Sequence, residues 1–386
     1  MTVLYFDHSA TTPPYDEVVE AFAEVMKKHY GNPSSLHHLG MEAERLVNRA
    51  REVIALSLGV KPAEIVFTSG GTESNNLAVK GIVNKYAHRG NHLITTMIEH
   101  PSVLRCFQEL EKEGAQVTYL PVDRTGSVRL EDLQKSLTDE TLLVSIMHVN
   151  NEMGRIQPIA EIGNWLKQYP RIVFHVDAVQ SVGKIPINPG AWRIDMLTVS
   201  AHKIRGPKGI GFLYKREGLL LNPLLSGGGQ ENGLRSGTEN VPAIVAMAKA
   251  VRMTMEQQSE HMRYMYGLRN KLTTILHSIP ELVLNGSDRE SDMAPQIVNV
   301  SFPGMKSEVV IHALESKGIM VSSQSACSSG EERPSRVLLA MGHPAERARS
   351  GIRISLSPMH TPKDIDLLGR AIREVVQELK QTMRLP

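Results

Sequence analysis

The stretch "IDMLTVSAHKIRGPKGIGFLYK", residues 194–215, contains two β-rich apolar runs separated by a short polar segment. Three glycines and one proline between residues 204 and 211 indicate a tight turn, so the stretch predicts two strands of a sheet. Lys203 lies directly after the first run, where a buried charge is costly unless it is paired or neutralised. The position of this lysine therefore needs a chemical explanation.

The same kind of β-rich run recurs throughout the region from about residue 60 to 215. The runs alternate with amphipathic stretches, and this alternation predicts an α/β domain built around a mostly parallel sheet. Pro101 stands at the first position of one expected helix, and Gly114 can close that helix. The expected strands are residues 64–68, 92–96, 116–120, 142–149, 171–177, 194–200 and 210–215.

The flanking regions predict further helices and a second domain. Apolar residues at helical spacing precede the strands, and a long helical region, about 241–278, follows them. The tail adds two strands and a final amphipathic helix near 362–382. We therefore expect a large α/β domain, residues 15–255, and a smaller α+β domain formed by residues 1–14 and 256–386.

Composition excludes several classes of protein. The chain has 386 residues, of which 41% are hydrophobic and 22% charged, so a disordered chain is not expected. Its 43 basic and 41 acidic residues are mixed along the sequence, which favours neither nucleic acid nor a membrane as a partner. We expect no secretory signal, because the first residues lack a basic region followed by an apolar stretch, and no apolar run approaches the roughly 20 residues of a membrane helix. Cys106 and Cys327 have no metal-ligand spacing, so we expect free thiols, no metal site and a cytoplasmic location.

Several expected strands end in polar clusters. Ligands of open α/β sheets bind beyond the carboxyl ends of the strands, so these clusters predict one shared site, although ordinary surface loops remain an alternative. The clusters are "TSGGTESNN" (68–76), "MIEHPS" (97–102), "VNNE" (149–152), "VDAVQ" (176–180) and "SAHK" (200–203).

Two of these clusters suggest which chemical groups of a ligand they would bind. "SGGTESNN", residues 69–76, follows a strand and opens a helix, so its backbone N–H groups and the helix dipole can hold a phosphate. The spacing matches neither common nucleotide motif, and a turn that needs glycine for its backbone alone is an equal alternative. Asp177 ends an apolar strand and suits either a protonated ring nitrogen or the N-cap of the next segment.

Lys203 supplies the remaining element. A lysine held where water is scarce has a lowered pKa and can form a Schiff base with a carbonyl compound. A phosphate loop, an acid and a lysine together describe the requirements of pyridoxal phosphate. His202 and Ser200 add possible phosphate contacts, and His100 can lie flat on a ring face. Lys208 is interpreted as a surface lysine.

Ten motifs, taken in order, resemble the NifS/IscS-like cysteine desulfurases. These are pyridoxal-phosphate enzymes of the class V aminotransferase fold, so the resemblance implies the PLP-dependent transferase (aspartate aminotransferase-like) fold, with PLP bound in the large domain. The motifs are "YFDHSATTP", "GNPSSLH", "IVFTSGGTESNN", "IEH", "SIMHVNNEMG", "HVDAVQSVGK", "SAHKIRGPKGIG", "LRSGTEN", "SACSSG" and "IRISLS".

The resemblance also implies residue roles. Lys203 would form the Schiff base with the cofactor and later move protons on the substrate carbons, Asp177 would pair with the pyridine nitrogen, and His100 would stack on the ring. A threonine from the partner subunit completes the phosphate site in this family, which implies a homodimer; Thr238 matches it. The other cofactor residues are Asn151 and Gln180 at the phenolic oxygen, and Gly71, Thr72, Ser200 and His202 at the phosphate.

Substrate roles follow from the same resemblance. Arg353 matches the arginine that takes the substrate carboxylate, and Asn32 is a possible further contact; without the resemblance, a surface charge would be the preferred interpretation of this arginine. Cys327 matches the cysteine that accepts sulfur, on a loop at about residues 321–334 of the small domain. A cysteine is more often a small buried hydrophobe, and that interpretation is kept for Cys106.

The implied activity is a cysteine desulfurase. It would convert L-cysteine to L-alanine, leave a persulfide on Cys327 and pass the sulfur to an acceptor protein for iron-sulfur cluster or tRNA thiolation pathways. Alternatives are another reaction of this cofactor, such as selenocysteine cleavage or transamination, a non-catalytic sulfur-relay scaffold, and a weakly supported dinucleotide-binding oxidoreductase. Three departures from the family pattern touch the sulfur loop, the dimer-side loop and the substrate rim: Gln324, Asn232 and residues 357–360.

Overall fold

A computed structural model describes residues 3–323 and 334–383 of the chain. Within these residues, seven strands form a central sheet in the order β2-β8-β7-β6-β5-β3-β4. All neighbouring strands are parallel except β8, which runs antiparallel to both β7 and β2. This confirms the predicted α/β domain with a mostly parallel sheet. The strands are β2 (Ile65–Thr68), β3 (His92–Thr96), β4 (Gln116–Leu120), β5 (Thr141–Ser145), β6 (Val173–Asp177), β7 (Met196–Ser200) and β8 (Gly211–Lys215).

The reversed direction of β8 follows from its short connection to β7. Parallel neighbours need a crossover of a dozen or more residues, whereas antiparallel neighbours can be joined by a short turn. Residues 201–210 make this connection and begin with a short 3-10 helix, η3 (Ala201–Lys203). The turn that carries Lys203 therefore stays at the carboxyl end of β7.

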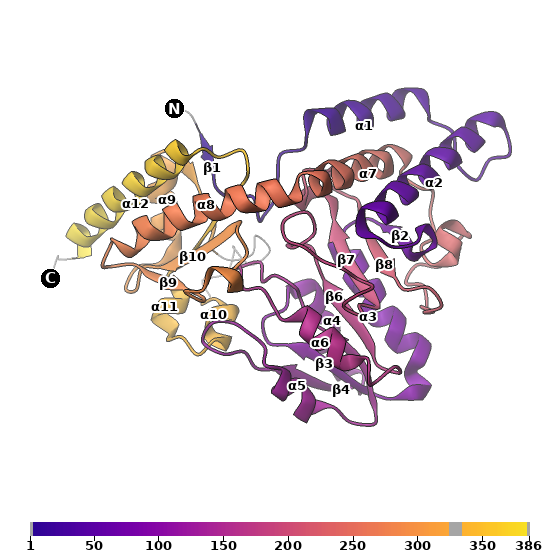
Figure 1. Cartoon of the computed structure of the whole chain (residues 1–386), viewed down its shortest axis with the longest axis horizontal. Helices are drawn as coiled ribbons and strands as arrows, with labels where there is room; N and C mark the ends of the chain where they lie inside the picture. Colours follow the sequence, from indigo (N-terminus) through magenta and orange to yellow (C-terminus); the bar gives the residue numbers. More distant parts are fainter. Residues whose placement is uncertain (1–2, 324–333, 384–386) are drawn as a thin grey trace.

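Helices cover both faces of the central sheet (Figure 1). One face carries α2 (His38–Leu58), α5 (Leu130–Ser136), α6 (Ile159–Leu166) and α7 (Val241–Glu256), and α1 (Asp16–Lys28) packs on α7. The other face carries α3 (Gly71–Tyr86) and α4 (Pro101–Lys112). As predicted, α4 begins at Pro101, and Gly114 follows it with φ 105°, in the region that favours glycine.

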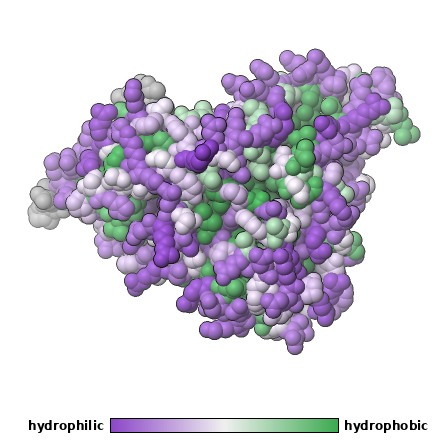
Figure 2. Space-filling model, viewed as in Figure 1, coloured by the Kyte–Doolittle hydropathy of each residue, from purple (hydrophilic) through white to green (hydrophobic). Residues whose placement is uncertain are grey.

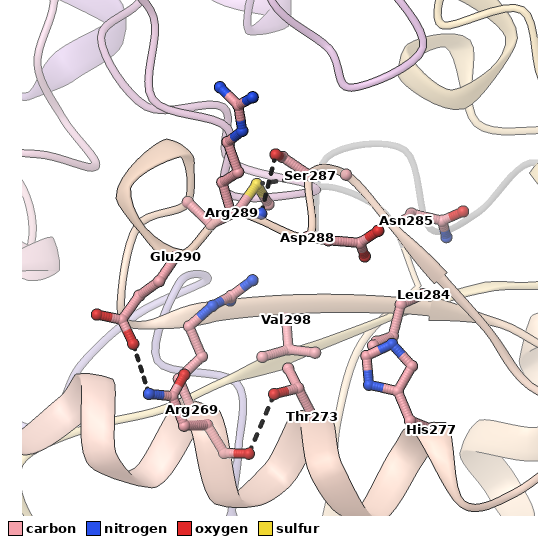
Figure 3. Close-up of a pocket in the computed structure, with 13 residues that line it drawn as sticks. Arg269, Thr273, His277, Leu284, Asn285, Ser287, Asp288, Arg289, Glu290 and Val298 are labelled. Atoms are coloured by element: carbon pink, nitrogen blue, oxygen red, sulfur yellow. Dashed lines mark hydrogen bonds between the residues drawn. The ribbon is translucent and has the colours of Figure 1, made fainter.

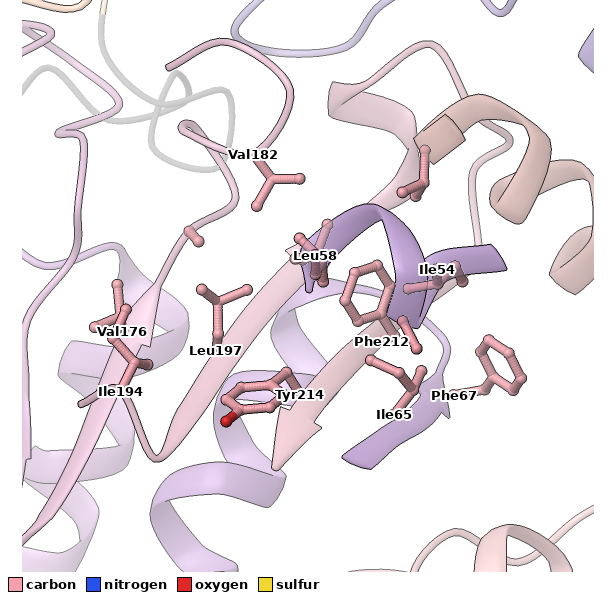
Figure 4. Packing of buried hydrophobic residues seen from close by; sticks show 14 of the residues in the cluster. Ile54, Leu58, Ile65, Phe67, Val176, Val182, Ile194, Leu197, Phe212 and Tyr214 are labelled. Atoms are coloured by element: carbon pink, nitrogen blue, oxygen red, sulfur yellow. The ribbon is translucent and has the colours of Figure 1, made fainter. Parts of the chain in front are cut away.

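The core alternates between the two faces of the sheet. Phe67 of β2 and Phe212 of β8 pack with Ile54 of α2 on one face (Figure 4). Val66 and Leu213, one residue along each strand, belong to the core on the opposite face. Successive side chains of a strand point to opposite faces, so strands that are apolar throughout are buried on both sides.

The C-terminal part of the chain forms a smaller antiparallel sheet with its own core. Its order is β12 (Gly351–Ser355), β10 (Ile297–Ser301), β9 (Val283–Asn285). The N-terminal β1 (Leu4–Tyr5) joins this part by pairing with β11 (Ile319–Met320). The helices here are α8 (Gln258–His277), α9 (Ser307–Ser316), α10 (Arg336–Ala340), α11 (Ala345–Arg349) and α12 (Pro362–Met383). The predicted tail strands and final helix are therefore confirmed.

The expected helical region over residues 241–278 is confirmed, and the structure divides it into two helices. α7 ends at Glu256 and α8 begins at Gln258, although neither glycine nor proline marks the break at Gln257. α7 packs on α1 and α2, whereas α8 packs on α12, so each helix serves a different core. Figure 1 shows the two helices end to end across the molecule. The domain boundaries at 14/15 and 255/256 remain a proposal.

The surface is mainly polar. Figure 2 shows polar side chains over most of one face, with apolar side chains gathered near its middle. Across the described part of the chain, no helix combines the length and the apolar character needed to cross a membrane.

Two helical glycines make a matched test of the packing. A Cβ on Gly163 of α6 would lie 1.7 Å from the carbonyl oxygen of Trp192, whereas a Cβ on the exposed Gly267 of α8 would have no neighbour within 4 Å. We expect G163A to lower the free energy of unfolding by about 3 kcal/mol through overpacking. G267A should raise it by about 0.5 kcal/mol, because alanine favours a helix. Urea unfolding of both variants measures this; equal effects would contradict the packing of α6.

Candidate active site

One cavity of about 320 Å³ lies at the carboxyl ends of the central strands. Residues from β6, β7, α3 and β12 line it, together with the N-terminal segment around Ser9 and Ala10. The structure thus brings together most of the residues singled out in the sequence: Gly71, Thr72, His100, Asn151, Asp177, Gln180, Ser200, His202, Lys203 and Arg353.

Lys203 reaches the cavity from η3. Its Nζ donates to the carbonyl oxygens of Ser9 and Ala10, each at 2.6 Å. The turn behind it is tight, because the Gly206 N–H donates to Ala201 O at 2.9 Å and a Cβ on Gly206 would lie 2.9 Å from that same oxygen. The lysine is therefore not a misplaced surface charge: the turn directs its amine inward to backbone acceptors.

Asp177 ends β6 with only 5% of its surface exposed. Its Oδ2 accepts from Asn75 Nδ2 at 2.9 Å, and its Oδ1 accepts from the Val179 N–H at 3.0 Å. The second bond is of the capping type, so the sequence alternative of a cap has support alongside the position of Asp177 in the cavity. Sequence reasoning missed Asn75, although it lies within the quoted "SGGTESNN" and shares the polar end of β2.

The N-terminus of α3 forms another wall of the cavity. Gly70 precedes the helix with φ 148°, and a Cβ on Gly71 would lie 3.0 Å from Val179 Cγ2 and 3.5 Å from Ser200 Cβ. The first N–H groups of a helix have no partner within the helix and attract an anion. This wall can therefore take a phosphate close to the backbone.

Two imidazoles in the cavity are held neutral. Burial, and then the charge of Lys203, lower the pKa of His202 to about 4, and its Nδ1 lies 3.2 Å from Thr11 Oγ1. Burial also lowers the pKa of His100, whose Nδ1 lies 2.8 Å from Ser102 Oγ at the start of α4. At neutral pH both rings are uncharged, so His100 can present a flat face and His202 can share hydrogen bonds.

Arg353 lies in β12 with 1% of its surface exposed, so the alternative of a surface charge is wrong. Its Nη1 donates to Asn151 O and its Nη2 to Asp7 Oδ1, both at 2.9 Å. Asp7 Oδ1 also accepts from Ser322 Oγ at 2.8 Å. Among the described residues, the buried Nε of Arg353 has no hydrogen-bond partner. Asp7 was missed as a functional residue, although it stands in the quoted "YFDHSATTP".

Glu99 is a fully buried acid beside the site that sequence reasoning also missed. Its Oε1 accepts from Thr96 Oγ1 at 2.7 Å and from the Met147 N–H at 2.9 Å, which ties the end of β3 to the segment after β5. Burial raises the pKa of its carboxyl to about 8. Glu99 precedes His100 directly, so this link helps to fix the imidazole.

Some predicted residues are not in this cavity. Thr238 and Asn32 are exposed and do not line it, and Asn32 Oδ1 instead accepts from the Ser34 N–H at 2.9 Å. Cys327 and Gln324 lie outside the described residues. Asn232 has φ 55°, a conformation that asparagine tolerates better than most residues.

Cys106 is buried in α4, as predicted. Its Sγ donates to Ser102 O at 3.1 Å, and burial raises the pKa of the thiol to about 11. A thiol with such a pKa stays protonated and unreactive at neutral pH. Cys106 therefore serves packing.

A second cavity, of about 80 Å³, lies between α8 and the segment after β9 (Figure 3). Several of its polar side chains already have partners: Arg269 Nη1 donates to Ile297 O, and Asn270 Nδ2 donates to Glu290 Oε2. None of the residues predicted to bind cofactor or substrate lines it. Its small size and paired side chains make it part of the small-domain structure.

The raised pKa of the buried Glu99 predicts that the free energy of unfolding depends on pH, even when no ligand is bound. The pKa of the Glu99 carboxyl is about 8 in the folded protein, whereas an ordinary glutamate in the unfolded chain has a pKa of about 4.3. The protonated carboxyl therefore contributes its full stabilisation of the folded state below about pH 4.3. This contribution is lost as the pH rises through about 8. The stability of E99Q relative to the wild type should therefore increase from pH 5 to pH 8 and then level off.

Urea unfolding across this pH range measures that difference. E20Q, at an exposed position of α1, is the matched control. A constant difference between E99Q and the wild type from pH 5 to pH 9 would contradict a raised pKa.

The comparisons with known proteins identify the family of the chain. Residues 4–368 match the family "Aminotransferase class-V". The chain is 43% identical over 378 residues to a cysteine desulfurase IscS of Dictyoglomus turgidum, covering 98% of this chain and 95% of that one. A solved NifS-like protein superposes with a TM-score of 0.91 at 40% identity over 97% of this chain and all of that one. SspA, solved in complex with cysteine, gives 0.80 at 37% identity, covering 92% of this chain and 99% of that one. The chain therefore belongs to the aminotransferase class-V family, among relatives named as cysteine desulfurases and NifS-like proteins.

Proposed function

We propose that this chain is a pyridoxal-phosphate-dependent cysteine desulfurase that converts L-cysteine to L-alanine and delivers the sulfur to Cys327. The observation that carries the proposal is the single cavity that holds Lys203, Asp177, His100 and Arg353 together. The relatives named as cysteine desulfurases, and the similar protein solved with cysteine, support the choice of substrate.

The residues of the cavity suit pyridoxal phosphate. The wall at Gly71 has no side chain where a phosphate would approach the start of α3, and the buried Asp177 suits a protonated ring nitrogen. Thr72, Ser200 and His202 would hold the phosphate, His100 would cover the ring, and Asn151 and Gln180 would reach the phenolic oxygen. When bound, this cofactor supplies an aldehyde that condenses with amines and a ring that takes up electrons from a breaking bond.

Lys203 would handle the protons of the reaction. Its Nζ would remove the proton from the α-carbon of L-cysteine and later return a proton to the β-carbon. The carbonyl oxygens of Ser9 and Ala10 hold the amine at the cavity wall. Because the amine is already restrained there, it loses less conformational entropy when it takes up its reactive position. The neutral His100 and His202 add no competing positive charge beside it at neutral pH.

Arg353 would bind the substrate carboxylate. Asn151 O and Asp7 Oδ1 occupy part of its guanidinium, and the Nε edge retains donor capacity toward a carboxylate. Because the group is fixed from behind, L-cysteine would be oriented with its side chain in a constant direction.

Cys327 would then take the sulfur. Its thiolate attacks the sulfur of L-cysteine, an S–S bond forms and the Cβ–S bond breaks, with the bonding electrons remaining on Cβ. Protonation at Cβ, followed by return of a proton to the α-carbon, gives L-alanine and leaves a persulfide on Cys327. The persulfide would pass its outer sulfur to an acceptor protein, for iron-sulfur cluster assembly or tRNA thiolation.

The active form would be a homodimer in the cytoplasm. Thr238 is exposed and lies away from the cavity of its own chain, which supports a role in the cavity of a partner subunit. The cytoplasmic location still rests on the use of cysteine in the sequence.

Two variants separate cofactor chemistry from sulfur transfer. K203A should lose the visible absorbance of the lysine-bound cofactor and all activity. C327A should keep that absorbance but form no persulfide. The measurements are the absorption spectrum, the mass of the protein after incubation with L-cysteine, and the alanine released. C327A that released alanine and sulfide as fast as the wild type would refute the assigned role of Cys327.

A conservative change at Arg353 tests carboxylate binding. Lysine keeps the charge but not the planar, bidentate donor set, so R353K should raise the KM for L-cysteine about tenfold or more, with a smaller change in kcat. R252K, at a half-exposed arginine of α7, is the matched control and should change neither constant. An unchanged KM in R353K with cofactor fully bound would exclude Arg353 from substrate binding.

A further inference from the structure

Lys184 is a second lysine near the cavity, and the proposed mechanism does not use it. It lies in the turn after β6, is half-buried and lines a small cavity behind Lys203. Gly183 precedes it with φ 75°, and a Cβ at Gly183 would lie 2.3 Å from Thr254 Cγ2. The turn therefore requires glycine at this point, and it places Lys184 under the active site.

The amine of Lys184 contacts one residue of the cavity. Lys184 Nζ donates to Gln180 Oε1 at 3.0 Å, and Gln180 Nε2 donates to Ser9 O at 2.9 Å. Ser9 O is also an acceptor for Lys203 Nζ. A short chain of hydrogen bonds thus runs from Lys184 through Gln180 and Ser9 to the amine of Lys203.

This chain fixes the orientation of the Gln180 amide. Ser9 O can only accept and Lys184 Nζ donates, so the atom of Gln180 that faces Lys184 is the carbonyl oxygen. The NH₂ group then faces Ser9 and the cavity. One of its two hydrogens is used by Ser9 O, and the other remains for a ligand acceptor. Without Lys184, Oε1 would lose its donor in a buried place, and the bond to Ser9 O alone would oppose its rotation toward the cavity.

Burial and neighbouring charges determine the pKa of Lys184. Burial, and then the charges of Lys203 and Arg353, lower its pKa to about 7, and no carboxylate is among these causes. His8 and His202 in turn feel its charge. The remaining titratable groups of the small cavity are Tyr15, Arg205 and His261.

We propose that Lys184 is a positioning residue that acts through Gln180, holding the amide oxygen away from the cavity so that Nε2 donates to the phenolic oxygen of the cofactor. The inference rests on the proposed cofactor role of Gln180. A donor at that oxygen favours its anionic form, as any hydrogen bond to a charged acceptor does. Lys184 therefore sets the protonation state of the bound cofactor without touching it.

The test is the pH midpoint of the visible absorption of the bound cofactor. K184M removes the donor, so the midpoint should rise by about one pH unit, the size of one lost hydrogen bond to a charged group. K184R keeps a donor and should restore most of the wild-type value. K184L, which also removes the donor, tests the same prediction in case K184M folds poorly. K208M, at an exposed lysine of the same region, is the matched control and should not shift.

A double-mutant cycle separates positioning from charge. If Lys184 acts through Gln180, K184M should cause almost no further shift in a Q180A background. An equal shift in both backgrounds would show that the charge acts directly, and it would overturn the inference. So would an unchanged midpoint in both K184M and K184L with cofactor bound, although the proposed function would then stand. A wild-type protein that took up no cofactor would overturn both.

Discussion

The structure depends on placing one amine, Lys203 Nζ, at the end of a buried strand. Backbone carbonyl oxygens of Ser9 and Ala10 satisfy it there, so the N-terminal segment must cross the carboxyl ends of the central strands. Further bonds fix that crossing: the Thr12 N–H and hydroxyl donate to His202 O, and the Tyr15 N–H donates to Arg205 O. Because β1 pairs with β11 in the C-terminal part of the chain, the same contacts link the two parts of the molecule.

The surroundings of the cavity keep most imidazoles neutral. Burial lowers the pKa of His148 and of His175 to about 3, and that of His8 falls to about 3 as well. The positive charges that remain are those of lysine and arginine, each held by named acceptors. A cavity of this kind favours anionic ligands at two ends: a phosphate at α3 and a carboxylate at Arg353.

Arg353, in β12, is the only described residue of the small sheet among the predicted site residues. Arg353 is held by Asn151 O from the segment after β5 and by Asp7 from the N-terminal segment. Binding at this arginine would therefore be sensitive to the relative placement of three separate segments. Lys184 and Glu99 extend the same principle, because each bonds directly to a residue that lines the cavity: Lys184 Nζ donates to Gln180 Oε1, and Glu99 Oε1 accepts from the Met147 N–H.

The sequence by itself determined the elements and the identity of most of the site. Apolar periodicity and glycine or proline signals are local, so the seven strands, the start of α4 at Pro101 and the final helix could be predicted. Only the tertiary structure decided the break at Gln257, the burial of Arg353 and the partners Asp7, Asn75 and Lys184. The reason is physical: a buried polar group is satisfied by whichever acceptor or donor the fold brings within about 3 Å. The bond from Arg353 to Asp7 joins residues 346 positions apart, a pairing that no local pattern encodes.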